Sequence, residues 1–152
     1  MMSLVQILLL IVAVLVGGAA AWVRFAPSDP EVWHVAPLRA ADPGRAGYLL
    51  MASGADNPVF EADTSEVLRA LDGIARATAR TKVLTGSVAE GRITYITRSR
   101  FWGFPDYTSV TATEVTGGSQ LVIFARLRFG RSDLGVNKAR VLSWMAQLRQ
   151  EL

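Results

Sequence analysis

The chain contains no cysteine and a single histidine among its 152 residues. Without cysteine it forms no disulfides and has no thiolate metal ligands. The lone histidine, His34, supplies neither a multi-histidine metal site nor a catalytic triad. The sequence also lacks a Gly-x-Ser-x-Gly motif, so the residues that common hydrolases and metal-dependent enzymes use are missing. We therefore expect no cofactor, and we favour a non-enzymatic protein over an enzyme.

Runs of lysine are absent as well. The formal net charge is +3, and nearly all the basic residues are arginines spread along the chain. A nucleic-acid module shows denser basic clustering, so we expect no nucleic-acid partner. A mildly basic surface is equally compatible with attraction to anionic lipid.

One long segment has no charge at all. Residues 4–23 are almost wholly apolar, and twenty helical residues span about 30 Å, the thickness of a bilayer core. Trp22 and Arg24 stand where interfacial residues belong. We predict a transmembrane anchor over residues 1–25, with the membrane as partner of residues 4–23. The alternative is a cleaved signal peptide, for which Ala19–Ala21 suit a peptidase; the uncharged start and the long apolar run favour the anchor.

The side of the membrane follows less directly from the sequence. Arg24, Arg39 and Arg45 follow the anchor, which by the positive-inside rule retains the C-terminal part in the cytoplasm. The tail before the anchor offers little charge, however, and long domains cross regardless of charge. We expect a single-pass membrane protein with its soluble domain outside the cytoplasm.

A connector over residues 26–46 follows the anchor and contains Pro27, Pro30, Pro37 and Pro43. Proline fixes φ and removes amide donors, so this stretch is expected to be extended and poor in helix. The remaining residues, 47–152, form the predicted folded domain.

The domain begins with a short apolar strand, Tyr48–Met51. Asp63 followed by Glu66 is a helix-start signature, and apolar residues at helical spacing then predict a helix over 64–79. Four segments rich in β-branched and aromatic residues predict strands. They are Thr81–Val88, Arg92–Arg100, Tyr107–Val115 and Ser119–Phe129.

A last helix is predicted from apolar residues at helical spacing, with Ser132, Asp133 or Asn137 as its cap. These apolar residues are Val141, Trp144, Met145, Leu148 and Leu152. The order β-α-β-β-β-β-α predicts an α+β fold, in which two helices cover one face of an antiparallel sheet of four to five strands.

Charged residues concentrate near the ends of the predicted strands. The pairs Arg98/Arg100 and Arg126/Arg128 each place two guanidinium groups on one face of a strand, since side chains two apart share a face. Carboxylate and amide residues stand in the loops beside them. The candidate set is Arg98, Arg100, Asp106, Arg126, Arg128, Arg131, Asp133, Asn137 and Arg140.

Three interpretations of this set remain open. In the first, Asp106 and Asp133 neutralise two of the four arginines in these Arg-x-Arg pairs, which form a structural ion network. In the second, the arginines converge on a patch that binds an anion through bidentate contacts. In the third, Asp106 or Asp133 is an acid/base and the arginines stabilise an anionic intermediate.

Two loops have alternatives of their own. The segment Gly130–Gly135 is either a tight strand-to-helix turn with positive φ or a phosphate loop, and the absence of a Gly-Lys-Ser/Thr ending favours the turn. The aromatic residues around Gly103 form either a membrane-touching or recognition lip or a corner of the core. They are Phe101, Trp102, Phe104 and Tyr107.

Two blocks carry a family resemblance. T-R-S-R-F-W-G-F-P-D (97–106) and R-L-R-F-G-R-S-D-L-G-V-N-K-A-R (126–140) resemble the DUF1499 family, a domain of unknown function, over roughly Pro58 to Leu152. The second block is the more specific. The resemblance implies a small α+β domain, often found in bacterial membrane-associated or exported proteins and in plastids. It implies no activity.

The sequence therefore predicts a membrane-anchored binding or accessory module of the cell envelope. Its expected partner is an anionic small molecule, a lipid headgroup or an envelope protein. The alternatives are a membrane-proximal enzyme that acts on an anionic substrate, and a purely structural member of a complex.

Overall fold

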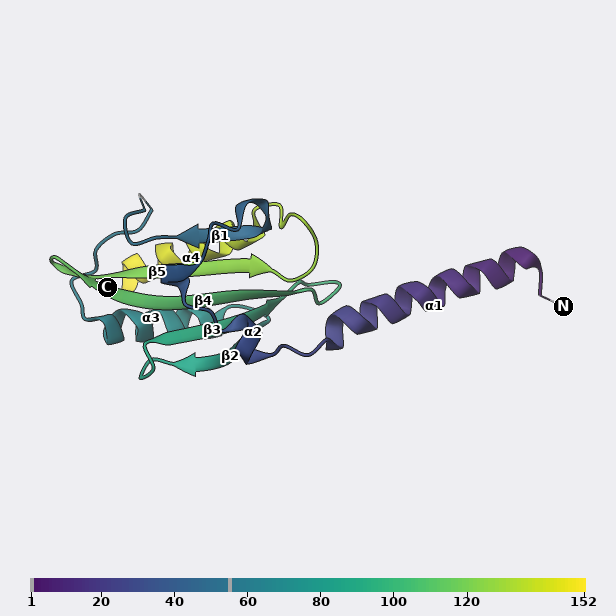
Figure 1. Ribbon diagram of the computed structural model, residues 1–152, viewed down its shortest axis with the longest axis horizontal. Coiled ribbons are helices and arrows are strands. Elements are labelled where there is room, and N and C mark those ends of the chain that lie inside the picture. Colours follow the sequence, from purple (N-terminus) through teal and green to yellow (C-terminus); the bar gives the residue numbers. More distant parts are fainter. Residues whose placement is uncertain (1, 55) are drawn as a thin grey trace.

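A long N-terminal helix, α1 (Leu4–Phe25), projects from an α+β domain in the computed structural model, which describes residues 2–54 and 56–152 (Figure 1). The side chain of Ser3 caps α1, and none of its residues is buried. Within the described part of the chain, α1 alone is long and apolar enough to cross a membrane; a signal sequence passes the same test.

The connector is not uniformly extended, so that prediction is wrong in part. It contains three short helical turns: α2 (Pro30–Trp33), η1 (Pro37–Arg39) and η2 (Gly44–Ala46). Pro30 and Pro37 stand in the first turn of α2 and η1, where the missing amide is not needed and the fixed φ suits a helix. Asp29 adds a cap by accepting a hydrogen bond from the amide of Glu31.

The domain has the predicted order of strands and helices, with boundaries within two residues of those expected for the strands and the first helix. The strands are β1 (Gly47–Leu50), β2 (Thr81–Ser87), β3 (Arg92–Arg98), β4 (Pro105–Val115) and β5 (Gly118–Leu127). The helices are α3 (Thr64–Ala77) and α4 (Val136–Glu151). Asp63 caps α3 by accepting from the amide of Glu66 at 2.8 Å, as its position predicts.

All the strands are antiparallel, in the order β1-β5-β4-β3-β2. The α+β class and the five-stranded antiparallel sheet with two helices are thus confirmed. The division of the chain at residues 25 and 46 stays a prediction.

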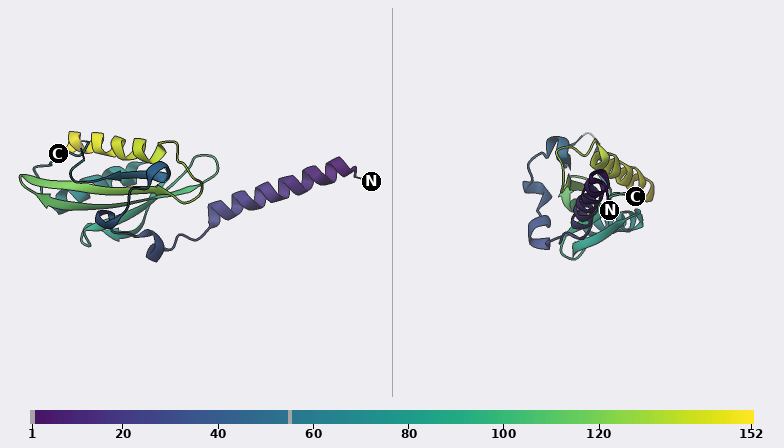
Figure 2. Two further views of the ribbon diagram at one scale, coloured as in Figure 1. Left: turned by 45° about the horizontal axis from the view of Figure 1, so that its top comes forward. Right: turned by 90° about the vertical axis from the view of Figure 1, so that its right-hand side faces the viewer.

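The two faces of the sheet have different covers (Figures 1 and 2). Helices α3 and α4 pack on one face and form the hydrophobic core with alternate residues of the strands. Leu121, Ile123 and Ala125 of β5 belong to this core, as the alternation in the sequence predicts. We call this side the helix face.

The connector crosses the opposite side, which we call the connector face. The ring of Trp33 stacks on Tyr107 with centroids 3.9 Å apart. His34 contacts Thr94 through Nδ1 at 2.8 Å and accepts a hydrogen bond from Arg92 Nε at Nε2, at 2.9 Å. An arginine only donates, so His34 is neutral with its proton on Nδ1. These contacts hold the connector on the sheet.

Candidate functional site

The residues predicted as one site lie in three separate places. Asp106, Asp133, Asn137 and Arg140 gather on the helix face, where α4 begins. Arg126 and Arg128 lie on the connector face, and Arg98 and Arg100 lie at the end of β3 nearest α1. Arg131 is exposed in the loop between β5 and α4.

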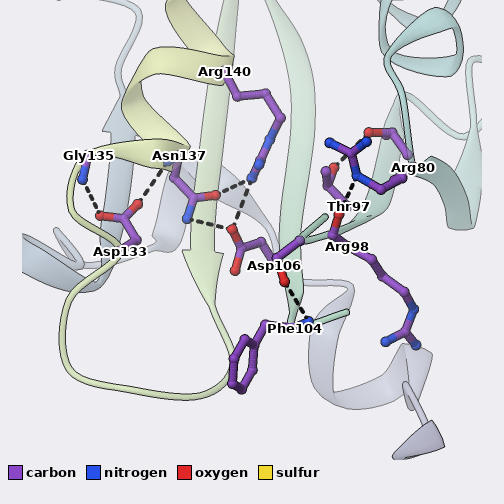
Figure 3. A network of polar contacts seen from close by, with 11 residues as sticks. Arg80, Thr97, Arg98, Phe104, Asp106, Asp133, Gly135, Asn137 and Arg140 are labelled. Carbon is purple, nitrogen blue, oxygen red and sulfur yellow. Dashed lines mark hydrogen bonds and ion pairs between the residues drawn. The ribbon is translucent and has the colours of Figure 1, made fainter. Parts of the chain in front are cut away.

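A buried ion pair forms the centre of the helix-face group (Figure 3). Arg140 Nη2 lies 3.6 Å from Asp106 Oδ2, and the two side chains are only 9% and 17% exposed. Asn137 joins them: its Nδ2 donates to Asp106 Oδ2 at 3.2 Å, and its Oδ1 accepts from Arg140 Nη2. The group links the start of β4 to the first turns of α4.

Burial dominates the electrostatics of this pair. Burial raises the pKa of Asp106, and Arg140 only partly offsets that effect. Burial also lowers the pKa of Arg140, against the attraction of Asp106. For both groups the loss of water outweighs the pairing, so the pair adds little stability by itself, whereas the loss of one partner leaves an uncompensated buried charge.

The cap residue of α4 is Gly135, not Ser132, Asp133 or Asn137 as predicted. Asp133 instead lies in the turn before α4 and accepts hydrogen bonds from main-chain amides there. Its two carboxylate oxygens accept hydrogen bonds from the amides of Gly135 and Asn137, each at 2.9 Å. Desolvation acts to raise the pKa of Asp133, but the backbone hydrogen bonds outweigh it and the pKa is lowered. Among residues 2–54 and 56–152, no arginine nitrogen lies within 4.0 Å of it. The prediction that Asp133 pairs with a motif arginine is therefore wrong.

The turn before α4 explains this geometry. Gly130 and Gly135 have positive φ angles of 106° and 81°, which glycine adopts without strain. The chain reverses so tightly that the carboxylate of Asp133 faces the amides of the first helical turn. It occupies donors that a phosphate would use, so the interpretation as a structural turn is confirmed.

Arg126 and Arg128 hold the connector instead of converging on an open patch. Their guanidinium carbons lie 4.7 Å and 5.8 Å from the ring centroid of Trp33. Arg126 donates to the carbonyl of Val32 at 3.3 Å, and Arg128 to that of Pro27 at 2.7 Å. The expectation that Asp106 and Asp133 neutralise two of the four Arg-x-Arg arginines is wrong, because Asp106 pairs with Arg140.

A basic pocket lies where α1 meets the domain. Its volume is about 260 Å³, and its lining contains five cationic side chains and no carboxylate. The lining residues are Arg24, Arg80, Lys82, Ile96, Arg98, Ser99, Arg100 and Gly103. Within the described part of the chain, none of these cations has a carboxylate oxygen within 4.0 Å.

Main-chain contacts fix the shape of this pocket. Arg98 Nη1 donates to the carbonyl of Gly103 at 2.9 Å, and Arg80 Nε donates to the carbonyl of Arg98 at 3.1 Å. Gly103 has a φ of 71° and lies so close to Arg24 that an added Cβ would be 3.1 Å from its Nη1. The guanidinium of Arg24 thus reaches from the end of α1 to the β3–β4 loop.

The aromatic residues of the β3–β4 loop are largely exposed. Phe101 is 82% exposed and Trp102 54%, whereas Tyr107 is 1% exposed beneath Trp33. The core-corner interpretation is therefore confirmed for Tyr107 and wrong for Phe101 and Trp102.

The sequence profile of a family described as "Protein of unknown function (DUF1499)" matches residues 35–148. This match covers three quarters of the chain. The chain belongs to the DUF1499 family. No curated protein and no solved structure matches the chain significantly. The DUF1499 region contains four cations of the basic pocket, and Arg24 lies before it.

The sequence motifs of this DUF1499 protein gave only part of the basic pocket. Arg98 and Arg100 were candidates, but Arg24, Arg80 and Lys82 come from three distant segments. One signal was available for Lys82. The β2–β3 hairpin places it opposite Ile96, on the strand face that also carries Arg98.

Proposed function

We propose that this DUF1499 protein is a membrane-tethered, non-enzymatic binding module whose basic pocket holds an anionic group. The observation that carries the proposal is the pocket's five uncompensated cations beside the end of the apolar helix. Guanidinium groups match phosphate and carboxylate in bidentate geometry. The cavity has room for one such group and part of the molecule that bears it.

The tether in this proposal is α1. Its 22 residues rise about 33 Å, enough to cross the bilayer core. Arg24 belongs to both the helix end and the pocket, which favours an uncleaved anchor over a removed signal peptide. As part of the proposal, the domain faces the cell envelope outside the cytoplasm, because long domains translocate largely regardless of flanking charge.

The enzymatic alternative has less support. Its acid/base candidates were Asp106 and Asp133, and neither lines the basic pocket. Asp106 is engaged by Asn137 and Arg140, and Asp133 by the amides of α4. A general acid or base must reach its substrate within hydrogen-bond distance, so the pocket favours binding over catalysis.

Anion binding is tested with the full-length protein in nanodiscs of neutral phosphatidylcholine. Inorganic pyrophosphate at ten times its Kd is expected to add about 1.4 kcal/mol of stability, which raises Tm by roughly 4–6 °C for a domain of this size. Sodium chloride at equal ionic strength is the control for screening. The double variant Arg98→Gln/Arg100→Gln is expected to lose the rise.

The matched control is Arg69→Gln, which removes an exposed arginine on α3, outside the pocket. It is expected to keep the full rise. An equal rise in the double variant, or none in the wild type, overturns the proposed anion site. The tether is tested by alkaline carbonate extraction of membranes, and release of the full-length protein or a mature N-terminus near Trp22 overturns it.

A further inference from the structure

The β3–β4 loop lies alongside the last turns of α1. Trp102 and Phe104 line one side of an apolar groove of about 320 Å³, and side chains of α1 line the other. These are Val16, Ala19, Ala20 and Val23. The loop therefore reaches past the C-terminal end of α1 and lies against the apolar surface of the last turns of the helix.

The position of this groove along α1 indicates how deep the β3–β4 loop lies relative to the membrane. Val16 and Val23 precede Arg24 in α1, so they lie on the side of Arg24 that faces the bilayer when α1 spans it. At 1.5 Å per residue, the groove covers about 10 Å of the helix. The aromatic rings of the loop thus lie at the level where the anchor enters the membrane.

Along the direction of α1, the exposed aromatic side chains and the basic pocket follow one another in the same order as the acyl-chain boundary and the phosphate layer of a bilayer leaflet. Trp102 is exposed and lies against α1, and its neighbour Phe101 is the most exposed ring of the loop. Aromatic side chains favour the boundary between headgroups and acyl chains. The basic pocket adjoins them, since Arg98 binds the carbonyl of Gly103 within the same loop. Lipid phosphates occupy the corresponding headgroup layer.

We infer that the β3–β4 loop, the end of α1 and the basic pocket form a docking surface for the membrane, in which the pocket holds the phosphate of an anionic lipid. The inference rests on the proposed function, because it needs both the tether and the anion site. It adds the source of the anion and a second attachment of the domain to the bilayer. A free phosphate fills the pocket without burying Phe101 or Trp102.

The absence of cysteine in the chain permits a direct test. Phe101→Cys and Thr116→Cys each introduce a single cysteine for a nitroxide label in the full-length protein. Thr116 is the control, because it is exposed in the β4–β5 turn, at the end of the sheet away from α1 (Figure 1). Oxygen and a water-soluble nickel chelate, which relax the label in lipid and in water respectively, report its depth.

In nanodiscs that contain phosphatidylglycerol, the label at residue 101 is expected to be severalfold more accessible to oxygen than to the nickel chelate. The label at 116 is expected to show the reverse. Combining Phe101→Cys with Arg98→Gln and Arg100→Gln is expected to move the label at 101 toward water. Cooperative melting of each labelled protein establishes that it is folded.

The outcomes separate the two proposals. A label at 101 that stays in water, in a protein that still binds pyrophosphate, refutes docking and leaves the anion site in place. A label in water without pyrophosphate binding refutes both. A label shielded from both reagents is covered by protein and overturns the lipid assignment. A label in lipid that is unchanged by the arginine substitutions overturns the role of the phosphate.

Discussion

Different interactions attach the helices to one face of the sheet and the connector to the other. On the helix face, an apolar core surrounds one buried ion pair. On the connector face, hydrogen bonds and stacked rings hold an irregular segment in place. Arg140, on the first face, has a carboxylate partner. Arg126, on the second, lies over aromatic rings and donates to a main-chain carbonyl.

This difference shows that the degree of burial of an arginine determines which interaction partners its charge requires. Beneath packed helices a guanidinium is cut off from water, and only a carboxylate prevents a large loss of free energy. Beneath a partly open connector, a ring face and a carbonyl suffice because water still reaches the charge. Predicted effects of substitution therefore decrease from the buried ion pair to the connector face and then to the turn before α4.

The largest effect is expected for Arg140→Met. The substitution leaves the carboxylate of Asp106 buried without its cation, and such a loss typically costs about 3–5 kcal/mol. Urea unfolding of the full-length protein in neutral detergent measures it. The double variant Asp106→Asn/Arg140→Met is expected to recover most of the stability. If the single variant lost less than about 1 kcal/mol, the pair would behave as exposed.

A smaller loss is expected for Trp33→Ala on the connector face. The substitution removes the ring that stacks on Tyr107 and lies under Arg126. Because Trp33 is only partly buried, we expect a loss of about 2 kcal/mol, below the range for a core tryptophan. Trp33→Phe keeps a ring and is expected to lose less. A loss equal to that of Arg140→Met would abolish the difference between the faces.

Asp133→Ala is expected to cost about 1 kcal/mol, a loss like that of a side chain that satisfies free amides at the start of a helix. The carboxylate accepts hydrogen bonds from the amides of Gly135 and Asn137, and Asp133→Asn keeps one acceptor. Unfolding in urea ranks the three proteins, with the asparagine variant in the middle. A loss near that of Arg140→Met would mean that Asp133 belongs to the buried ion network after all.

The smallest effect is a pH dependence from His34. Burial lowers its pKa, and Arg92 lowers it further. The folded state thus binds a proton less readily than the unfolded chain, whose histidine pKa is about 6.5. The stability from neutral His34 is present above that value and is lost as pH falls through the lower folded pKa.

His34→Gln is therefore expected to flatten the profile of unfolding midpoint against pH on the acid side of neutrality. The readout is the difference between wild type and variant across that range. Parallel profiles would show that His34 does not couple the connector to the sheet.

Local patterns in the sequence were enough for the elements of the fold. The cap at Asp63 and the alternation in β5 each depend on neighbours within a few residues, so the sequence shows them directly. The two family-like blocks also placed the domain in the right family.

The site needed long-range information that these patterns lack. Asp106 meets Arg140 only because the start of β4 lies beside the first turns of α4. Arg24, Arg80 and Arg98 meet because the end of an external helix lies against a loop between strands. No spacing rule predicts such meetings. The two Arg-x-Arg pairs therefore looked able to converge on one patch, although Arg98 and Arg100 line the basic pocket and Arg126 and Arg128 hold the connector.

The strand at one edge of the sheet has a consequence for synthesis. β1 pairs with β5, with Tyr48 opposite Ala125, although α3 and three strands lie between them in the chain. At a translation rate of about 5–20 residues per second, β1 waits roughly 4–15 seconds for its partner to be made. During that interval β1 lacks the strand with which it pairs in the finished fold. Completion of the sheet is therefore a late, non-local step, and we expect it to set the pace at which the protein matures.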